Sequence, residues 1–507
     1  MAAHLRRLFP YEPQDGSILT LIISVMMLRL ITSLYFPMGV DETYAIVVSR
    51  FPTLSYFDHP PLGFDFARAV AWATGSEAPF VVRFPHVIMG TLSSWYLYKI
   101  TARLFGIQAA FYAVAWYSAA PFFFISSGHF VVPDGPLNLF LVLGLWWLLP
   151  LFDGDHSLTT RQWVNIGIAM ALALMSKYQA VLFGVAVAIA VLWNPQARKS
   201  LATKGPWLAL LIAALGMIPM IYWNSQHEWI SFKFQSGRAG NGLTLYSCNF
   251  LLTLAGQMVY VLPGSWLMAQ YFAASAIIKP NREAERLLGI IVLLPVVIFD
   301  VIALISEKSL PHWPMSGFLF AFPLLGLGIT TLPQRFQTIL RLVFRPALIG
   351  IFLTALLVSA QTHTAFLTRF SFAEAPRYDL DSQLVGWDAL RLDFQQRNLL
   401  ESFDTFIIPS KWSEGGRAGY ALGPQIPVAI PLNDPRHFSY TGDARLSTRA
   451  NGYIVFEADL GDAKSEAPGW ANAAADRYVT TGNMWTITQT RMGFPAFDIG
   501  VIPVRRR

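Results

Sequence analysis

The sequence predicts a polytopic α-helical membrane protein that carries a small C-terminal α/β domain outside the membrane. Hydrophobic residues make up 54% of its 507 residues and charged residues only 13%, which is too apolar for an ordinary soluble protein. Many apolar runs approach the roughly 20 residues that a helix needs to cross a bilayer. These runs end near Ser371, where polar residues become frequent and short strand-like segments begin.

About eleven apolar runs are long enough, or nearly long enough, to cross the membrane. The first is expected to be an uncleaved anchor, because it is longer than the apolar core of a secretory signal and lacks a small-residue cleavage site. The expected spans are 18–36, 84–105, 107–125, 131–151, 162–176, 179–193, 206–223, 251–272, 287–305, 311–330 and 346–361.

Lysine and arginine gather in alternate loops. If the N-terminus is cytoplasmic, every inner loop is basic, as the positive-inside rule requires. The odd number of spans then places the loop 37–82, the His227 loop and the whole C-terminal region on the outer face. The net charge of +6 is explained by this topology and needs no nucleic-acid partner.

The composition predicts two domains, a transmembrane domain over 1–370 and a soluble domain over 371–507. Cys248 is the only cysteine, so no intrachain disulfide and no cysteine-based metal site can form. Strand-like runs in the soluble domain are 403–408, 426–430, 453–457 and 485–490.

The loop 37–82 is too long for a turn and too polar to span. Two short amphipathic helices along the membrane are expected in it. Asp41 can cap a helix over Glu42–Arg50, and Pro61 can open a second helix that ends at Gly75.

Three acids near the outer face are candidates for function. Asp41 and Asp58 lie in the loop 37–82, and Asp134 follows Pro133 at the outer end of the fourth span. Taken singly, Asp41 and Asp134 are explained as helix caps and Asp58 as a turn residue. Helix caps and turns do not require two acidic motifs beside aromatic residues and a Pro-Pro. The combination therefore favours a functional site.

Lys177 falls in a short outer turn between two spans. It either snorkels to the interface or holds a phosphate. Arg29 and Asp300 are the charges set deepest in the expected spans, and we interpret them as a structural pair between helices.

These motifs together resemble the protein O-mannosyltransferase and lipid A aminoarabinose transferase superfamily of membrane glycosyltransferases, the GT-C class. The similarity covers roughly residues 15–330 and is carried mainly by the first 180. The motifs are Asp41-Glu42-x-Tyr44, Tyr56-Phe57-Asp58-His59-Pro60-Pro61-Leu62, Val82-Arg83-Phe84-Pro85, Pro133-Asp134 and Ser176-Lys177.

The resemblance implies a GT-C fold and an inverting transfer of a sugar from a polyprenyl-phosphate carrier to an acceptor on the non-cytoplasmic face. Asp41 would be the catalytic base, with Glu42 beside it, and Arg83 and Lys177 would stabilise the departing phosphate. An alcohol nucleophile needs a base and a phosphate leaving group needs cations, so the chemistry fits these residue types.

The chain departs from the lipid A branch at one position, where Glu-Lys commonly precedes Pro-Pro and this sequence has Asp58-His59. His59 can be cationic, a hydrogen-bond donor or a metal ligand. No cofactor is required by the sequence, and a divalent cation held by Asp41, His59 and Asp134 is left open. The same resemblance adds three candidates to the donor-binding residues Asp58, His59, Arg83, Asp134 and Lys177: His227, Lys308 and His312.

We therefore expect a glycosyltransferase of a bacterial inner membrane with a glycolipid or lipopolysaccharide acceptor, such as lipid A or core, and a periplasmic active site. A protein O-glycosyltransferase is the first alternative. A secondary transporter or flippase is a rival, although no repeated halves are visible and the acids gather on one side. A catalytically silent scaffold would tolerate Asp41→Asn.

Overall fold

The computed structural model describes residues 15–154, 157–238, 244–366 and 384–507. The chain forms two compact units. The first comprises 1–31, 54–66 and 83–352, and the second comprises 32–53, 67–82 and 353–507. The expected boundary at 370/371 falls outside the described residues.

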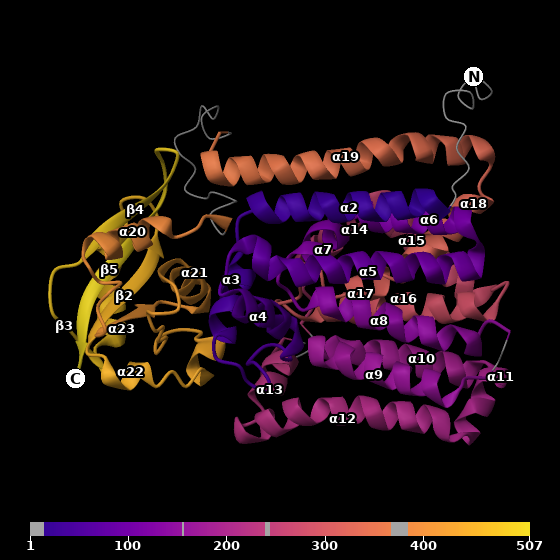
Figure 1. Ribbon diagram of the computed structural model, residues 1–507, viewed down its shortest axis with the longest axis horizontal. Helices are drawn as coiled ribbons and strands as arrows, with labels where there is room; N and C mark the ends of the chain where they lie inside the picture. The colour runs from indigo at the N-terminus through magenta and orange to yellow at the C-terminus, as the bar shows by residue number, and fades with distance from the viewer. Residues whose placement is uncertain (1–14, 155–156, 239–243, 367–383) are drawn as a thin grey trace. The chain divides into compact units, whose positions relative to one another are not determined.

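The first unit is built of helices, most of which run side by side (Figure 1). Helix α9 packs between α8 and α12, and α16 packs against α10 and α15. Helices α2, α4, α5 and α19 belong partly to each unit. The bounds are α2 Asp15–Tyr35, α4 Leu62–Thr74, α5 Pro79–Phe105, α6 Ile107–Ala119, η1 Phe122–Ser126, α7 Ser127–His129, α8 Asp134–Leu148, η2 Leu149–Leu151, α9 Thr160–Ser176, η3 Tyr178–Ala180, α10 Val181–Trp193, α11 Pro195–Arg198, η4 Lys199–Ala202, α12 Lys204–Gln226, α13 Ile230–Gly237, α14 Ser247–Val261, α15 Pro263–Ile278, α16 Glu283–Ile305, α17 Met315–Phe318, α18 Ala321–Thr331 and α19 Gln334–Thr364.

Four helices in the described part of the chain are long and apolar enough to cross a membrane: α2, α8 with η2, α12 and α16. Three bent pairs raise the number to seven if each pair is one span. They are α6 with η1 and α7, η3–α10 with α11–η4, and α14 with α15, bent by 82°, 101° and 98°. The prediction of a multi-pass helical protein is confirmed, but the count of eleven spans is not, because helices such as α18, with 11 residues, are short of a span.

Contacts at one end of the first unit join loops that were expected to share the inner face. Arg103 Nε lies 3.0 Å from Asp153 Oδ2, and Arg282 donates to the carbonyl of Leu104 over 2.8 Å. Both contacts link segments that are far apart in the sequence. They agree with the expected alternation of the helices, while the side of the membrane on which this end lies stays a prediction.

Arg29 is buried in α2 and bonded to the π-helical segment η1. It donates to the carbonyls of Phe123 and Phe124 over 2.8 and 3.2 Å. The wide turns of a π-helix leave carbonyls without their usual partners, and the guanidinium supplies donors for them. A Cβ at Gly128 would lie 2.6 Å from Arg29 Cζ, and one at Gly90 would lie 3.1 Å from Nη1. Two glycines therefore make the space that the guanidinium occupies.

Asp300 in α16 has a different environment. Its carboxylate accepts a hydrogen bond from Gln257 over 2.7 Å, and Gln257 accepts one from the indole of Trp266 over 3.0 Å. This chain bridges the bend between α14 and α15. The expected Arg29–Asp300 pair is therefore wrong, because each residue satisfies polar groups at a different break in the helices.

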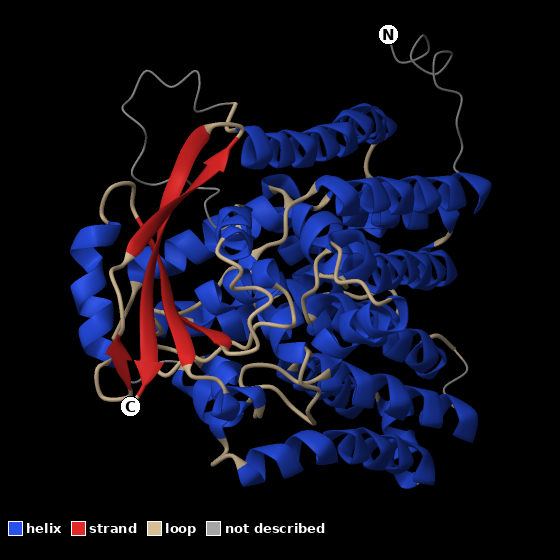
Figure 2. Cartoon of the chain, turned by 60° about the vertical axis from the view of Figure 1, so that its left-hand side comes forward, coloured by secondary structure: helices blue, strands red, loops and turns tan. Residues whose placement is uncertain are grey.

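The second unit contains a five-stranded sheet with helices on both faces (Figure 2). The strand order is β1-β2-β5-β3, and β4 also pairs with β5. Strands β1 and β2 are parallel and connected through α21, whereas the other pairs are antiparallel. The bounds are α20 Asp388–Gln396, β1 Thr405–Pro409, α21 Trp412–Leu422, η7 Arg436–Tyr440, α22 Arg445–Thr448, β2 Asn451–Ala458, α23 Ala463–Ala474, β3 Tyr478–Thr480, β4 Trp485–Arg491 and β5 Phe494–Arg506.

Alternate residues of the strands point to opposite faces of this sheet. Phe406 and Ile454 pack in one cluster with Ala467 of α23, while α21 packs against β1 and β2. The predicted α/β domain is thus confirmed. The expected strand at 426–430 is wrong, because the segment makes only a single parallel bridge between Val428 and Ile407.

The second unit also contains α3 (Val40–Ser49), the first helix expected in the loop 37–82. The N-cap residue is Gly39, not Asp41, so the expected capping role of Asp41 is wrong. Asp41 instead lies in the first turn, where an acid interacts favourably with the helix dipole. Helix α4 ends before Gly75, which has φ +68° and stops the helix as expected.

Candidate functional site

The motif Tyr56–Pro61 of the first unit is held in place by α13. Ser231 donates to the carbonyl of Tyr56 over 3.1 Å, and Gln235 donates to the carbonyl of Asp58 over 2.6 Å. The N–H of Tyr56 bonds to the carbonyl of His59 and closes the segment on itself. The segment is therefore fixed through its backbone carbonyls and N–H groups.

Asp134 and Lys177 form a buried ion pair in the first unit. Lys177 Nζ lies 2.9 Å from each carboxylate oxygen of Asp134, and the residues are only 8% and 5% exposed. Asp134 is the first residue of α8 and follows the N-cap Pro133, so its expected role as N-cap is wrong. Lys177 is the residue at which α9 ends. It does not snorkel, because its ammonium group is directed to the carboxylate.

His312 lies between α16 and α17, close enough to this pair to feel its charges. The pKa of His312 is lowered to about 3, mainly by burial; the positive charge of Lys177 contributes to this lowering, and Asp134 opposes it. Arg238 and His59 act on the same imidazole and also lower its pKa. The imidazole is thus neutral near pH 7. Four of the expected site residues, His59, Asp134, Lys177 and His312, are therefore brought together, with Arg238 as an additional cation.

The remaining expected residues of the first unit are more varied. Arg83, in the second turn of α5, is fully buried, and its guanidinium lies 5.2 Å from the ring centroid of Phe130. His227 stacks on Trp223, with ring centroids 4.0 Å apart. Lys308 is exposed in the loop after α16. Of these three residues, Arg83 alone has the burial expected of a charge with a specific task.

Asp65 and Tyr178 are two ionisable residues near this site that the sequence reasoning missed. Tyr56 donates to Asp65 over 3.1 Å, and burial raises the pKa of Asp65 to about 6 although this hydrogen bond lowers it. The hydroxyl groups of Tyr178 and Ser55 are 3.3 Å apart. Asp65 lies shortly after the Pro-Pro, and Tyr178 directly follows Lys177. Their closeness in the sequence to an expected motif is the signal that could have identified them.

Asp41 and Glu42 lie on α3 in the second unit and differ in exposure. Asp41 is exposed, whereas Glu42 is fully buried and its Oε2 accepts the N–H of Gly39 over 3.0 Å. Glu42 thus satisfies one of the donors at the start of α3, as the third residue of a capping box does. The exposed acid has the solvent access that a general base requires, and the buried acid fixes the helix start.

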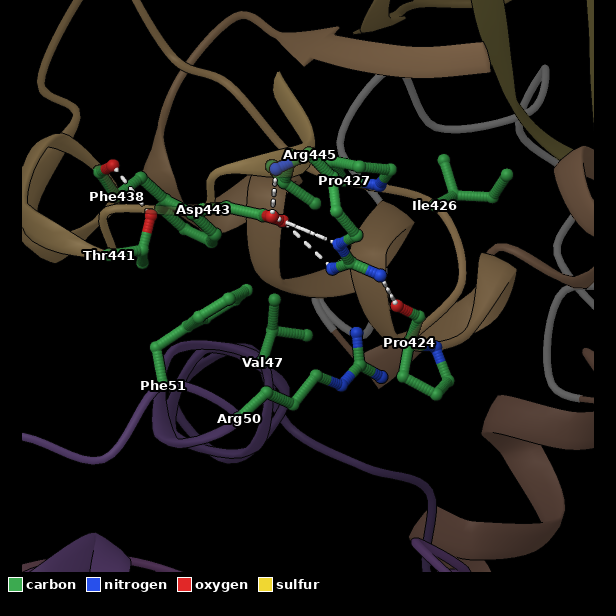
Figure 3. Close-up of a pocket in the computed structure, with 11 residues that line it drawn as sticks. Val47, Arg50, Phe51, Pro424, Ile426, Pro427, Phe438, Thr441, Asp443 and Arg445 are labelled. Atoms are coloured by element: carbon green, nitrogen blue, oxygen red, sulfur yellow. Dashed lines mark hydrogen bonds and ion pairs between the residues drawn. The ribbon is translucent and has the colours of Figure 1, made fainter. Parts of the chain in front are cut away.

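The second unit also contains a pocket at the other end of α3, with about 270 Å³ of empty space that includes open solvent (Figure 3). Val47, Arg50 and Phe51 line it on one side and Arg445 on the other. Arg445 is bonded to Asp443 and to the carbonyl of Pro424. Because α3 rises roughly 1.5 Å per residue, Asp41 lies about 9 Å along the helix from Val47, so this pocket does not surround the candidate base.

No group of three or more His, Cys, Asp or Glu side chains is placed to hold a metal ion within the described residues. Asp41, His59 and Asp134 are all among those residues. The divalent cation that the sequence left open therefore gains no support from their arrangement.

The chain is similar to known proteins in sequence and in fold. The family described as dolichyl-phosphate-mannose-protein mannosyltransferase matches residues 58–223, which include Asp58, His59, Arg83, Asp134 and Lys177. A curated relative, the lipid A galacturonosyltransferase RgtD of Rhizobium johnstonii, is 25% identical over 325 residues. That match covers 61% of this chain and 64% of the relative's length.

Two solved structures match nearly the whole chain. ArnT from Cupriavidus metallidurans in the apo state has a TM-score of 0.65 at 14% identity, covering 96% of this chain and 97% of ArnT. The same protein bound to undecaprenyl phosphate has a TM-score of 0.64 at 15% identity, covering 97% and 98%. These comparisons confirm the resemblance predicted from the sequence: the chain has the fold of ArnT and is similar in sequence to a family of mannosyltransferases and to a lipid A galacturonosyltransferase.

Proposed function

We propose that this protein is an inverting glycosyltransferase that moves a sugar from a polyprenyl-phosphate carrier to a glycolipid or lipopolysaccharide acceptor, such as lipid A or core. It acts at the periplasmic face of a bacterial inner membrane, with its N-terminus in the cytoplasm. The C-terminal domain is periplasmic as well. The positive-inside pattern of the loops supports this orientation.

The proposed reaction needs a base and a cationic site. Asp41 takes the proton of the acceptor hydroxyl, whose oxygen attacks the anomeric carbon of the sugar. The bond from that carbon to the phosphate oxygen breaks, and the electron pair leaves with the polyprenyl phosphate. Arg83 and Lys177 oppose the charge that grows on the phosphate, and such electrostatic stabilisation is usually the largest catalytic contribution.

The observation that carries this proposal is the buried Asp134–Lys177 pair with His59, His312 and Arg238 around it. Burying the charges of Asp134 and Lys177 is costly, and buried charges beside other titratable groups are frequent at functional sites. The cluster lies in a fold whose ArnT representative was crystallised with undecaprenyl phosphate. Asp134 accounts for two of the three donors of Lys177, so the ammonium retains one further N–H for a phosphate oxygen.

The relative RgtD supports a glycolipid acceptor, because its name assigns it a galacturonosyl transfer to lipid A. The matching part covers 64% of that protein. A uronic acid is the first sugar to test.

Deletion of the protein followed by mass spectrometry of total lipopolysaccharide and membrane glycolipids tests the proposal. We expect one glycolipid species to lose the mass of a single sugar, and the wild-type gene to restore it. An Asp41→Asn gene expressed at equal membrane abundance should not restore it. An unchanged lipid profile in the deletion strain would contradict the proposed acceptor.

Protein O-glycosylation is the second candidate, supported by the family description that matches 58–223. Offering an acceptor peptide and lipid A in parallel to the purified protein separates the two. Transfer to the peptide alone would replace the glycolipid proposal.

A further inference from the structure

Helix α21 of the C-terminal domain packs directly against α3, the helix that carries Asp41. Both helices belong to the second unit. The contact is made by the sequence Glu414-Gly415-Gly416-Arg417-Ala418-Gly419, in which small residues face α3 and the loops beside it. The absence of side chains at the glycines lets the two backbones approach closely.

Gly416 is the closest point of this contact. A Cβ at Gly416 would lie 2.7 Å from the backbone nitrogen of Tyr44 and 2.9 Å from its Cα. Real Cβ atoms do not approach backbone atoms so closely, so even an alanine would push α3 away by several tenths of an ångström. At Gly419, a Cβ would lie 3.0 Å from Val47, one turn further along α3.

Tyr44 anchors α3 to the same domain through its side chain. Its hydroxyl accepts the N–H of His437 over 3.2 Å, and its ring packs edge-on to Trp412 and Phe438 at centroid distances of 5.2 and 5.8 Å. The guanidinium of Arg436 lies 3.6 Å from the ring centroid of Trp412 and covers its face. Residues at the start of α21 and in η7 therefore hold Tyr44, which lies three positions after Asp41.

The C-terminal end of α3 is held as well. Arg50 donates to the carbonyl of Gly419 over 3.0 Å and forms a two-bonded pair with Glu77, at 3.1 and 2.7 Å. Tyr420 of α21 donates to the carbonyl of Glu77 over 2.8 Å. In Figure 3, Arg50 and Val47 of α3 face the segment around Pro424 and Arg445. Helix α3 is therefore fixed at both ends by the C-terminal domain.

We propose that α21 is a positioning element for catalysis: the C-terminal domain sets the place of α3 and thereby of the Asp41 carboxylate. Gly416 and Tyr44 are positioning residues that act through Asp41. This inference rests on the proposed role of Asp41 as the base, and it gives the C-terminal domain a task in the reaction.

The physical basis is the sensitivity of proton transfer to distance. A general base must lie within hydrogen-bond reach of the proton it accepts. Displacements of about 1 Å can lower turnover roughly 100-fold without changing any reacting group. A shift of α3 should thus lower turnover, while binding of the lipid-phosphate carrier, which the cationic residues of the first unit are proposed to provide, stays unchanged.

The test compares Gly416→Ala with Gly469→Ala in the full-length purified protein. Gly469 is a matched control because it is also a helical glycine of this domain, in α23, and a Cβ there would meet nothing within 4 Å. Three quantities are measured for each: hydrogen exchange of the α3 amides, affinity for undecaprenyl phosphate, and turnover. For turnover, the donor is the polyprenyl-phosphate fraction of wild-type membranes and the acceptor is the glycolipid fraction of the deletion strain.

We expect Gly416→Ala to speed exchange in α3 and to lower turnover about 10- to 100-fold, with unchanged affinity for undecaprenyl phosphate. Gly469→Ala should match the wild type in all three. Unchanged turnover in Gly416→Ala would overturn the proposal, and so would an equal loss in the control variant. A parallel loss of carrier affinity would assign Gly416 a merely structural role and also overturn it.

Tyr44→Phe provides a second variant in case Gly416→Ala does not fold. It keeps the aromatic contacts and removes the hydroxyl that accepts the N–H of His437, so a smaller loss of turnover in the same pattern is expected. The Asp41→Asn protein separates this inference from the proposed function. If Asp41→Asn retains full turnover, the base assignment fails; if it loses turnover while Gly416→Ala and Tyr44→Phe do not, only the positioning role fails.

Discussion

Asp134 and Asp41 are the same residue type in two very different settings. Asp134 is buried and has both carboxylate oxygens 2.9 Å from Lys177, whereas Asp41 is exposed in the first turn of α3. A buried carboxylate whose two oxygens both contact a lysine ammonium stabilises that pair. An exposed carboxylate can exchange protons with substrate and solvent. The comparison teaches that the pattern of acids in a sequence marks a site but does not assign the base.

The pair also explains why Asp134 and Lys177 have to be considered together. Taking both charges out of water is costly, and their attraction offsets that cost only while both are present. Asp41 is exposed, so its carboxylate keeps contact with water. Changes at the pair should therefore alter stability, whereas changes at Asp41 should alter turnover without altering stability.

Lys177→Met should produce the largest loss of folding stability. It leaves the Asp134 carboxylate buried without its cation, which costs about 3–5 kcal/mol of folding stability. Thermal unfolding of the purified protein and its abundance in membranes measure this loss. The double variant Asp134→Asn/Lys177→Met removes both charges and should recover part of the stability. A Lys177→Met protein as stable as the wild type would contradict the view that Asp134, unlike Asp41, depends on a buried partner for stability.

Asp41→Asn should lower turnover by ~10²–10⁴, the usual loss of a general base, while leaving thermal unfolding unchanged. The amide has nearly the same shape and cannot take the acceptor's proton. Turnover is measured at equal membrane abundance, with Asp388→Asn in the first turn of α20 as a control that should retain wild-type turnover. Activity within a few-fold of wild type would remove Asp41 from the mechanism.

Glu414 offers a third setting, a carboxylate whose burial raises its pKa to about 7 from the ordinary 4.5. A raised pKa in the folded state means that stability is fully present below pH 4.5 and is lost as the pH rises through 7. The loss amounts to at most about 3 kcal/mol. Glu414→Gln should be more stable than the wild type at pH 8 and similar at pH 4.5, as unfolding curves at the two values will show. An identical pH dependence in both proteins would exclude Glu414 as its source.

Glu42→Gln should have the smallest effect. The amide oxygen can still accept the N–H of Gly39, so turnover should fall only a few-fold and stability by less than about 1 kcal/mol. Glu42→Ala removes the acceptor and should cost about 1 kcal/mol. Measured side by side, the two variants show whether Glu42 acts through the helix start. A loss for Glu42→Gln as large as that for Asp41→Asn would instead make Glu42 a partner in proton transfer.

The sequence predicted the fold class and most helices because apolar runs and basic loops are local signals. It did not predict the bend at Leu262, which divides the expected span 251–272, although the following Pro263 carries that information. The strand expected at 426–430 had the right composition, but pairing depends on neighbours that lie elsewhere in the chain.

The candidate site was predicted as a set of residues rather than as an arrangement. Asp134 and Lys177 were both named, yet their pairing depends on how α8 and α9 pack, which no local pattern contains. Asp65 and Arg238 were missed, because a single charge outside a motif has no distinctive spacing. Residues that act through chemistry were thus easier to predict than the partners that hold them.

The guanidinium of Arg29 and the glycines at 90 and 128 have an evolutionary consequence. A Cβ at either glycine would contact the arginine, so substitutions at these three positions should depend on one another. Related chains that keep the arginine should keep both glycines. Chains that have a smaller residue in place of the arginine should accept larger residues at the two glycine positions. The carbonyls of Phe123 and Phe124 would then need another donor, and the distorted turn around them should revert to ordinary helix in such lineages.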